Sequence, residues 1–123
     1  MPKRLISVAL GLLSLLTTAI RVDAHAFLVR AEPRVGSKVK KAPTEVQIWF
    51  SESIQSRVSS ITVSDGNGKR LDKHDAHVDQ HDRKLLQVSL PPGLAPGSYR
   101  VIWRVTSVDT HVTGGDFRFQ IAP

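Results

Sequence analysis

The sequence predicts an all-β fold, a small antiparallel Greek-key β-sandwich of immunoglobulin-like size with six to seven short strands. Apolar and polar residues alternate in several short runs, which is the period of a strand with one buried face. Clusters of Pro, Gly, Asn and Asp separate these runs and mark turns. No window shows the helical period of an amphipathic helix of ten or more residues. These three observations favour a two-layer β domain over any fold with long helices.

The expected strands follow one another along the chain, beginning with residues 26–30. The alternating residues that should face the core of the later strands are Val46, Ile48 and Phe50; Ile61 and Val63; Leu86, Val88 and Leu90; Tyr99, Val101, Trp103 and Val105; and Phe117, Phe119 and Ile121. A weak strand is expected near residues 69–71, and the polar stretch 72–84 is expected to be a loop. Trp103 belongs to this predicted core, whereas Trp49 is out of phase with its neighbours and is expected near the surface or near a metal.

The first 24 residues have the pattern of a cleaved export signal. Two positive charges precede an uncharged run of 16 residues, 5–20, which is shorter than the roughly 20 residues of a membrane-spanning helix. Residues 22–24 place small side chains two apart, as at a signal-peptidase site. We expect cleavage after Ala24, which makes 1–24 a signal peptide and 25–123 the mature domain. A retained membrane anchor is the alternative.

Composition narrows the classes of function. The chain is 41% hydrophobic and 23% charged, as folded domains are. It has no Cys, which excludes a disulfide scaffold, a thiolate zinc or iron–sulfur site, a thiol nucleophile and a blue-copper centre. Removing 24 of the 123 residues leaves 99, with a net charge of +4 instead of +6. About 100 residues can form a stable core unaided, and none of the remaining runs could span a membrane. We therefore expect a soluble periplasmic or secreted protein.

The net positive charge of the chain does not predict nucleic-acid binding. Lysines cluster within residues 38–41, and Arg100, Arg104 and Arg118 occupy alternating strand positions. However, the domain shows no nucleic-acid recognition motif, and export would separate it from most nucleic acid. We expect these cations to form a solvated face.

His25 would become the first residue of the mature chain, and that position changes its chemistry. A terminal His offers its free α-amine and its ring Nδ1 to the same metal ion. The amine has a reference pKa of about 8, so a metal must compete with a proton there.

A second candidate feature is the segment 107–111, Ser-Val-Asp-Thr-His, between two expected strands. On an extended segment, Asp109 and His111 would point to the same side because they are two residues apart. Gly114 and Gly115 would provide the tight backbone that returns the chain to the sheet. Loops of a sandwich cluster at its two ends, so this segment could meet His25, although sequence alone leaves that meeting open.

If they meet, one amine nitrogen, two imidazole nitrogens and one carboxylate oxygen are available to a metal. Such a set suits Cu(II) in tetragonal geometry, and Zn(II) could use the same donors in a tetrahedral arrangement. Soft ligands for Cu(I) are missing from the mature chain, since Cys is absent and the single Met is Met1.

Three histidines and three aspartates fall within residues 73–82. His74, His77 and His81 could form a second, weaker metal site. We favour the alternative, a hydrophilic loop with solvated charges, because gathering ligands on a flexible loop costs conformational entropy.

Taken together, these motifs resemble the CopC family of periplasmic copper-binding proteins, small cupredoxin-like β-sandwiches. The resemblance covers 25–123. It rests on His25-Ala26-Phe27-Leu28 directly after the signal, Pro33 and Gly36 before Pro43, Phe50-Ser51-Glu52, Gly97-Ser98-Tyr99-Arg100-Val101 with Trp103-Arg104, and Ser107-Val108-Asp109-Thr110-His111 before Gly114.

The resemblance implies a monomeric periplasmic protein, not an enzyme, that binds Cu(II) through His25, Asp109 and His111. Glu52 is a weaker candidate ligand. Some family members also carry a Met-rich Cu(I) loop, from which this sequence departs. The resemblance implies that the protein sequesters copper for resistance or homeostasis, or delivers it to an inner-membrane transporter of the CopD type.

Two other classes of function stay open at the level of sequence. A terminal His with a second His is also the metal-binding pattern of lytic polysaccharide monooxygenases, so a copper-dependent oxidase with a histidine-brace-like site is one alternative. That chemistry needs an open coordination position and a substrate platform. A metal-free immunoglobulin-like interaction module is the other.

Overall fold

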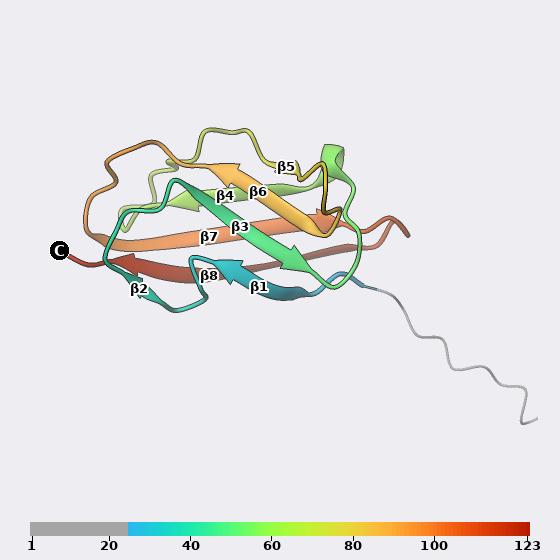
Figure 1. Cartoon of the computed structure of the whole chain (residues 1–123), viewed down its shortest axis with the longest axis horizontal. Coiled ribbons are helices and arrows are strands. Elements are labelled where there is room, and N and C mark those ends of the chain that lie inside the picture. Colours follow the sequence, from blue (N-terminus) through green and yellow to red (C-terminus); the bar gives the residue numbers. More distant parts are fainter. Residues whose placement is uncertain (1–24) are drawn as a thin grey trace, which may run out of the picture.

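The computed structural model describes residues 25–123, which form a sandwich of two four-stranded sheets (Figure 1). One sheet has the strand order β1-β3-β6-β5 and the other has the order β2-β8-β7-β4. The strands are β1 (Leu28–Glu32), β2 (Lys38–Val39), β3 (Glu45–Phe50), β4 (Ser60–Ser64), β5 (His77–Val78), β6 (Leu85–Ser89), β7 (Gly97–Thr106) and β8 (Val112–Ile121). The single described helix is one 3-10 turn, η2 (Ser56–Val58). None of the helices within 25–123 has the length and apolar character needed to cross a membrane.

The predicted all-β sandwich is confirmed, with four differences in its elements. The strand pairs are antiparallel as expected, except that β2 pairs with β8 in parallel. There are eight strands because two of them, β2 and β5, have only two residues each. The strand β5 lies within 72–84, which we expected to be entirely loop. The strand expected near 69–71 is absent, because Arg70 makes only an isolated bridge to Ser64. The predicted signal peptide, 1–24, lies outside the described residues.

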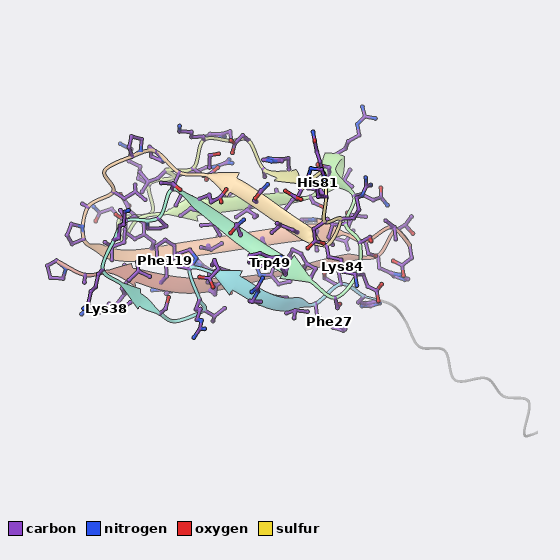
Figure 2. The ribbon with its side chains drawn as sticks, viewed as in Figure 1. Phe27, Lys38, Trp49, His81, Lys84 and Phe119 are labelled. Carbon is purple, nitrogen blue, oxygen red and sulfur yellow. The ribbon has the colours of Figure 1, made fainter. Side chains whose placement is uncertain are left out.

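The alternation of apolar and polar residues along the strands produces the core that we predicted. Every residue that the pattern assigned to the core is buried, and these side chains form one cluster between the sheets. Figure 2 shows Phe119 within the sandwich. The indole of Trp103 meets the ring of Phe50 edge to face, with ring centroids 5.1 Å apart. Trp49 is half-buried outside this core, where the guanidinium carbon of Arg30 lies 3.8 Å from its ring centroid. Trp49 is therefore a surface residue stacked on a cation.

A tyrosine fastens the connection that precedes β7. The hydroxyl of Tyr99 donates a hydrogen bond to the carbonyl of Ala95 at 2.5 Å, the arrangement called a tyrosine corner in Greek-key sandwiches. Burial raises the pKa of this hydroxyl above its usual value. The hydroxyl therefore stays protonated and remains a donor over the physiological pH range.

The edge of β4 is covered by a side chain rather than by a strand. The buried carboxylate of Asp72 accepts hydrogen bonds from the backbone N–H of Val63 at 2.8 Å and from Arg70 Nε at 2.9 Å. It also accepts from the N–H of His74 at 3.2 Å. Burial alone would raise the pKa of Asp72, but the Arg70 guanidinium and the two backbone donors outweigh it and lower that pKa. The carboxylate takes the place of a strand carbonyl opposite Val63, so the pairing of 69–71 with β4 is limited to two backbone hydrogen bonds, from Leu71 N–H to the Val63 carbonyl and from Asp65 N–H to the Lys69 carbonyl.

Gly114 and Gly115 do not form the turn that we expected. Both lie inside β8, opposite Arg104 and Trp103 of β7. A Cβ atom added to Gly115 would lie 2.6 Å from Cζ2 of the Trp103 indole. The absence of a side chain at Gly115 therefore lets the indole pack directly against the strand backbone.

Candidate metal centre

The segment 107–111 forms a tight turn at one end of the sandwich, between β7 and β8. The N–H of Thr110 donates to the carbonyl of Ser107, and the N–H of Ser107 donates to the carbonyl of His111, both at 2.9 Å. Thr110 has a φ of 75°, which β-branched residues rarely adopt. The segment is thus not extended, and our reason for placing Asp109 and His111 on one side was wrong.

The turn nevertheless places Asp109 and His111 side by side. Asp109 Oδ1 accepts a hydrogen bond from the N–H of His111 at 3.3 Å, and Oδ2 lies 3.2 Å from His111 Nδ1. The side chains are 37% and 48% exposed respectively, so both are open to solvent. A carboxylate and an imidazole are therefore presented together, as the sequence predicted.

Ser107 orients the carboxylate of Asp109. Its buried hydroxyl donates a short hydrogen bond to Asp109 Oδ1, and its carbonyl accepts from Gln55 Nε2 at 2.9 Å. The hydroxyl of Ser107 is the main reason that the pKa of Asp109 lies below its usual value, and the contacts with His111 lower that pKa further. Asp109 is therefore ionised well into the acidic range and available as a hard oxygen ligand.

The start of the described chain is fixed to the same end of the sandwich. The hydroxyl of Ser51, just after β3, accepts from the N–H of Phe27 at 2.9 Å and donates to the carbonyl of His25 at 3.3 Å. The hydroxyl of Thr113 donates to the carbonyl of Ala26 at 2.8 Å. These bonds hold residues 25–27 between the end of β3 and the start of β8.

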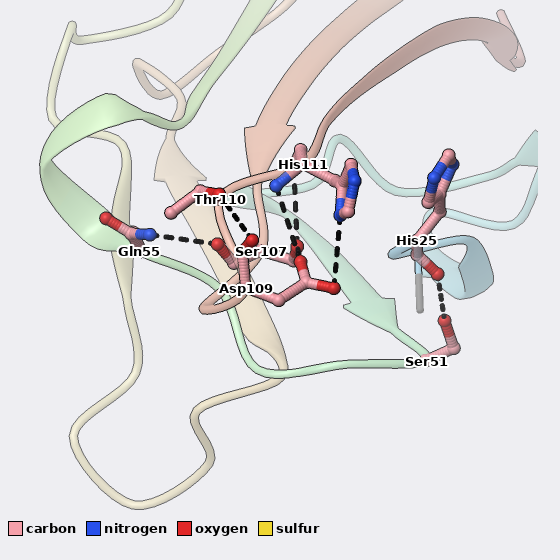
Figure 3. Close-up of polar contacts among 7 residues, drawn as sticks. All are labelled: His25, Ser51, Gln55, Ser107, Asp109, Thr110 and His111. Atoms are coloured by element: carbon pink, nitrogen blue, oxygen red, sulfur yellow. Dashed lines mark hydrogen bonds and ion pairs between the residues drawn. The ribbon is translucent and has the colours of Figure 1, made fainter. Parts of the chain in front are cut away.

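As a result, the imidazoles of His25 and His111 lie next to each other. Their ring centroids are 4.7 Å apart and their planes are inclined by 30°. Figure 3 shows the two rings facing each other, with Asp109 on the other side of His111. The structure thus brings together His25, Asp109 and His111, the three ligands predicted from the sequence.

The three side chains are neighbours, but their donor atoms do not converge in this arrangement. Across residues 25–123, no group of three or more His, Asp or Glu side chains is arranged to hold a metal ion. Here His111 Nδ1 faces the carboxylate of Asp109. Joint binding of an ion by Asp109 and His111 would therefore require this contact to open.

Glu52, the weaker candidate, forms no hydrogen bond or ion pair with the three predicted ligands in the described chain. Glu52 follows Ser51 in sequence and is half-buried. It has no hydrogen bond or ion pair with another residue of the described range 25–123. Its role as a ligand remains a prediction.

The three-histidine segment is not gathered into a ligand group. Asp75 accepts from the N–H of Ser89 at 2.8 Å, and Asp79 accepts from the N–H of His81 at 2.9 Å. His77 lies in β5 and places its Nδ1 2.8 Å from the carbonyl of Asp75. Both carboxylates accept from backbone N–H groups, Asp79 within its own turn and Asp75 from the end of β6, and no metal-ligand cluster is found in the described part of the chain. A second site at His74, His77 and His81, and the solvated loop that we favoured over it, both remain predictions.

Sequence reasoning missed the residues that position the candidate ligands, namely Ser51, Ser107 and Thr113. Ser107 could have been suspected, because Ser and Asp side chains often form local hydrogen bonds in turns. Ser51 and Thr113 act on residues 26 and 87 positions away. No local pattern identifies such partners.

Comparisons with known proteins agree with the motifs. The family model of the CopC domain matches residues 28–122. Protein YobA of Escherichia coli strain K12 is 33% identical over 112 residues, which cover 89% of this chain and 90% of YobA. Copper transport protein CutJ of Bacillus subtilis strain 168 is 32% identical over 98 residues, which cover 80% of this chain and 18% of CutJ. The crystal structure of CopC from Methylosinus trichosporium OB3b aligns with a TM-score of 0.75 at 33% identity, over 80% of this chain and 95% of that one. The chain therefore belongs to the CopC family.

Proposed function

We propose that this protein is a periplasmic Cu(II)-binding protein that sequesters copper or carries it to a membrane transporter. The observation that carries the proposal is the adjacency of the His25 and His111 imidazoles, 4.7 Å apart, with the Asp109 carboxylate beside His111. Membership of the CopC family and the copper-related names of its relatives support it.

The chemistry of the donors favours Cu(II) over other copper states. Cleavage after Ala24 would add the α-amine of His25 to two imidazoles and a carboxylate, a set of nitrogen and oxygen donors that suits tetragonal Cu(II). Residues 25–123 contain neither Cys nor Met, so the soft ligands that stabilise Cu(I) are absent. Reduction of the bound ion, or protonation of the amine and imidazoles, would loosen it and offers two routes of release.

We propose that the end of the sandwich that carries His25, Asp109 and His111 binds copper and transfers it to a partner, and that it does not catalyse a reaction. Asp109 lies against the imidazole of His111, close to where an oxidase would need an open coordination position. The position of Asp109 therefore does not support the alternative of a copper-dependent oxidase. A metal-free module would not account for a turn and an anchored N-terminal segment that together place two imidazoles and a carboxylate at one solvent-exposed end.

A membrane transporter of the CopD type is the partner that we propose. The region of CutJ that resembles this chain is 18% of that protein, so a similar domain occurs within a longer protein named for copper transport. Hand-over between separate chains would replace that covalent connection. The sandwich encloses its own core, and we propose that it is a monomer.

A Cu(II) titration followed by electron paramagnetic resonance tests the site. Protein that begins at His25 should give a single nitrogen-rich tetragonal signal. Protein with one extra residue before His25 should bind far more weakly, because its α-amine is replaced by an amide nitrogen. Identical weak signals from both proteins would refute the terminal-histidine site. A titration with Zn(II) in the same two proteins distinguishes copper selectivity from general affinity for divalent metals.

A further inference from the structure

The outer face of the β2-β8-β7-β4 sheet carries two arginines that face each other directly. Arg100 of β7 is paired in register with Arg118 of β8, and Ser64 of β4 lies on the other side of Arg100. Both arginines are exposed. Like charges directly opposite each other in an antiparallel pair destabilise the sheet. The pairing of Arg100 with Arg118 therefore lowers the stability of this sheet.

Only one of the two arginines is neutralised by the protein. Arg100 Nε lies 3.1 Å from Asp116 Oδ2, in a contact where both side chains are 49% exposed. Arg118 has no ion pair with any residue in the described range 25–123. A positive charge thus remains uncompensated beside the Arg100–Asp116 pair.

The facing arginines border a hollow of about 370 Å³, which we name the arginine hollow; Ser64, Ser98, Arg100 and Arg118 line it. The hydroxyls of Ser64 and Ser98 donate no hydrogen bond within the described chain, so they are available to a ligand. Asp65 also borders the hollow, but its Oδ1 accepts from the N–H groups of its own turn, at 2.9 and 3.0 Å. The hollow therefore combines the guanidinium of Arg118, which is unpaired within the described chain, the guanidinium of Arg100 that is paired with Asp116, and two free hydroxyl donors, with the Asp65 carboxylate at its border.

We propose that the arginine hollow binds a phosphate-type oxyanion, with Arg118 as its principal contact. A planar guanidinium matches the oxygens of a phosphate in a bidentate manner. An anion held between Arg118 and Arg100 would also relieve their mutual repulsion. The same chemistry is available from inorganic phosphate and from the phosphate of an anionic lipid headgroup.

This proposal does not rest on metal binding. The arginine hollow lies at the start of β7, whereas the candidate metal centre follows its end. Ser107 follows Arg100 by seven positions along the strand, which corresponds to roughly 20 Å. Loss of one site can therefore be measured without loss of the other.

The test is a titration of ¹⁵N-labelled protein with inorganic phosphate, with sodium chloride matched for ionic strength. We expect saturable shifts of the amide signals of Ser64, Ser98 and Arg118. Arg118→Gln should weaken phosphate binding by about ten-fold or more, because it removes the bidentate contact. Arg104→Gln is the matched control, because it removes one cation from the same sheet face outside the hollow. Shifts that follow ionic strength alone, or that fall equally in both variants, would overturn the proposal.

Co-sedimentation with vesicles identifies the source of the phosphate. Vesicles of phosphatidylglycerol mixed with phosphatidylcholine should retain the protein more than phosphatidylcholine alone if lipid headgroups occupy the hollow, and Arg118→Gln should reduce retention more than Arg104→Gln. Saturable phosphate binding without retention on vesicles supports a soluble oxyanion. Equal loss of retention in both variants indicates diffuse adsorption and overturns a lipid site. The proposal is wrong if neither phosphate nor vesicles bind.

Discussion

The hydroxyl of Ser51 donates a hydrogen bond to the carbonyl oxygen of His25, 3.3 Å away. The Ser51 hydroxyl oxygen also accepts a hydrogen bond from the N–H of Phe27 at 2.9 Å, and the N–H of Ser51 donates to the carbonyl of Phe27 at 2.9 Å. Ser51 therefore clamps the backbone on both sides of Ala26. Through this clamp, a residue that contributes no donor to the candidate metal centre decides where one of its ligands lies.

Replacement of Ser51 by Ala should weaken Cu(II) binding by about three- to ten-fold. Loss of a typical hydrogen bond costs about 1 kcal/mol, and here the lost bonds order the chain that carries His25. Competition with a chelator of known affinity measures the change. Ser53→Ala is the control, because Ser53 lies in the same segment and contributes its carbonyl, not its hydroxyl, to the turn. Equal affinities for wild type and Ser51→Ala would show that the clamp does not matter for the metal.

Replacement of Ser107 by Ala should raise the pKa of Asp109 toward its usual value. The Ser107 hydroxyl is the main cause of the lowered pKa, and a methyl group cannot donate a hydrogen bond. Asp109 would then take up a proton at a higher pH, so Cu(II) binding should begin to fail at a higher pH as the solution is acidified. Carboxyl ¹³C titration of the metal-free protein measures the pKa. Asp79, whose pKa is lowered mainly by the N–H of His81, is an internal control that should not move.

Replacement of Asp72 by Asn should destabilise the fold by about 2 kcal/mol at pH 7, because hydrogen bonds to a charged group are lost. The folded state lowers the pKa of Asp72, so its stabilisation is fully present above the unfolded pKa of about 3.9. This stabilisation disappears as the pH falls through the folded value. Denaturant unfolding at pH 7 and at pH 3 measures the difference between variant and wild type. That difference should shrink at pH 3.

Asp116→Asn is the control for Asp72→Asn. Asp116 forms an exposed pair with Arg100, and such pairs contribute about 0–1 kcal/mol. If both variants lose the same stability at pH 7, the buried position of Asp72 is not what matters.

Replacement of Gly115 by Ala should destabilise the protein by about 1–3 kcal/mol, the usual cost of overpacking. The new Cβ would lie 2.6 Å from the Trp103 indole, which must move. Tryptophan fluorescence should change with the loss of stability. Gly66→Ala is the control, because its Cβ would come no nearer than 3.8 Å to another atom, the Ser98 carbonyl oxygen. An unchanged midpoint of unfolding for Gly115→Ala would contradict the packing argument.

Replacement of His74, His77 and His81 together by Ala should leave the stoichiometry and affinity of Cu(II) binding unchanged. Their neighbours Asp75 and Asp79 accept hydrogen bonds from backbone N–H groups, and the three histidines do not form a ligand group in the described chain. Equilibrium dialysis counts the bound ions. His111→Ala is the comparison that should lose the main site. Loss of one bound ion in the triple variant would reveal a second site.

Sequence alone determined the class of fold, the core and the identity of the candidate ligands. Alternation is a local property, because the pleat of a strand sends successive side chains to opposite faces. The core positions of β3, β7 and β8 could therefore be read without a structure. The family was also recognisable from short motifs, of which His25 and the pair Asp109 and His111 are the chemical part.

Only the tertiary structure decided how these residues meet. His25 and His111 are neighbours because the register of β7 against β8 places the turn at one end, and because Ser51 and Thr113 fasten the start of the described chain there. Gly115 was misread as a turn residue, since its partner is an indole on the neighbouring strand. Such contacts join residues distant along the chain, and they depend on strand register and sheet packing. Local patterns in the sequence do not predict strand register or sheet packing.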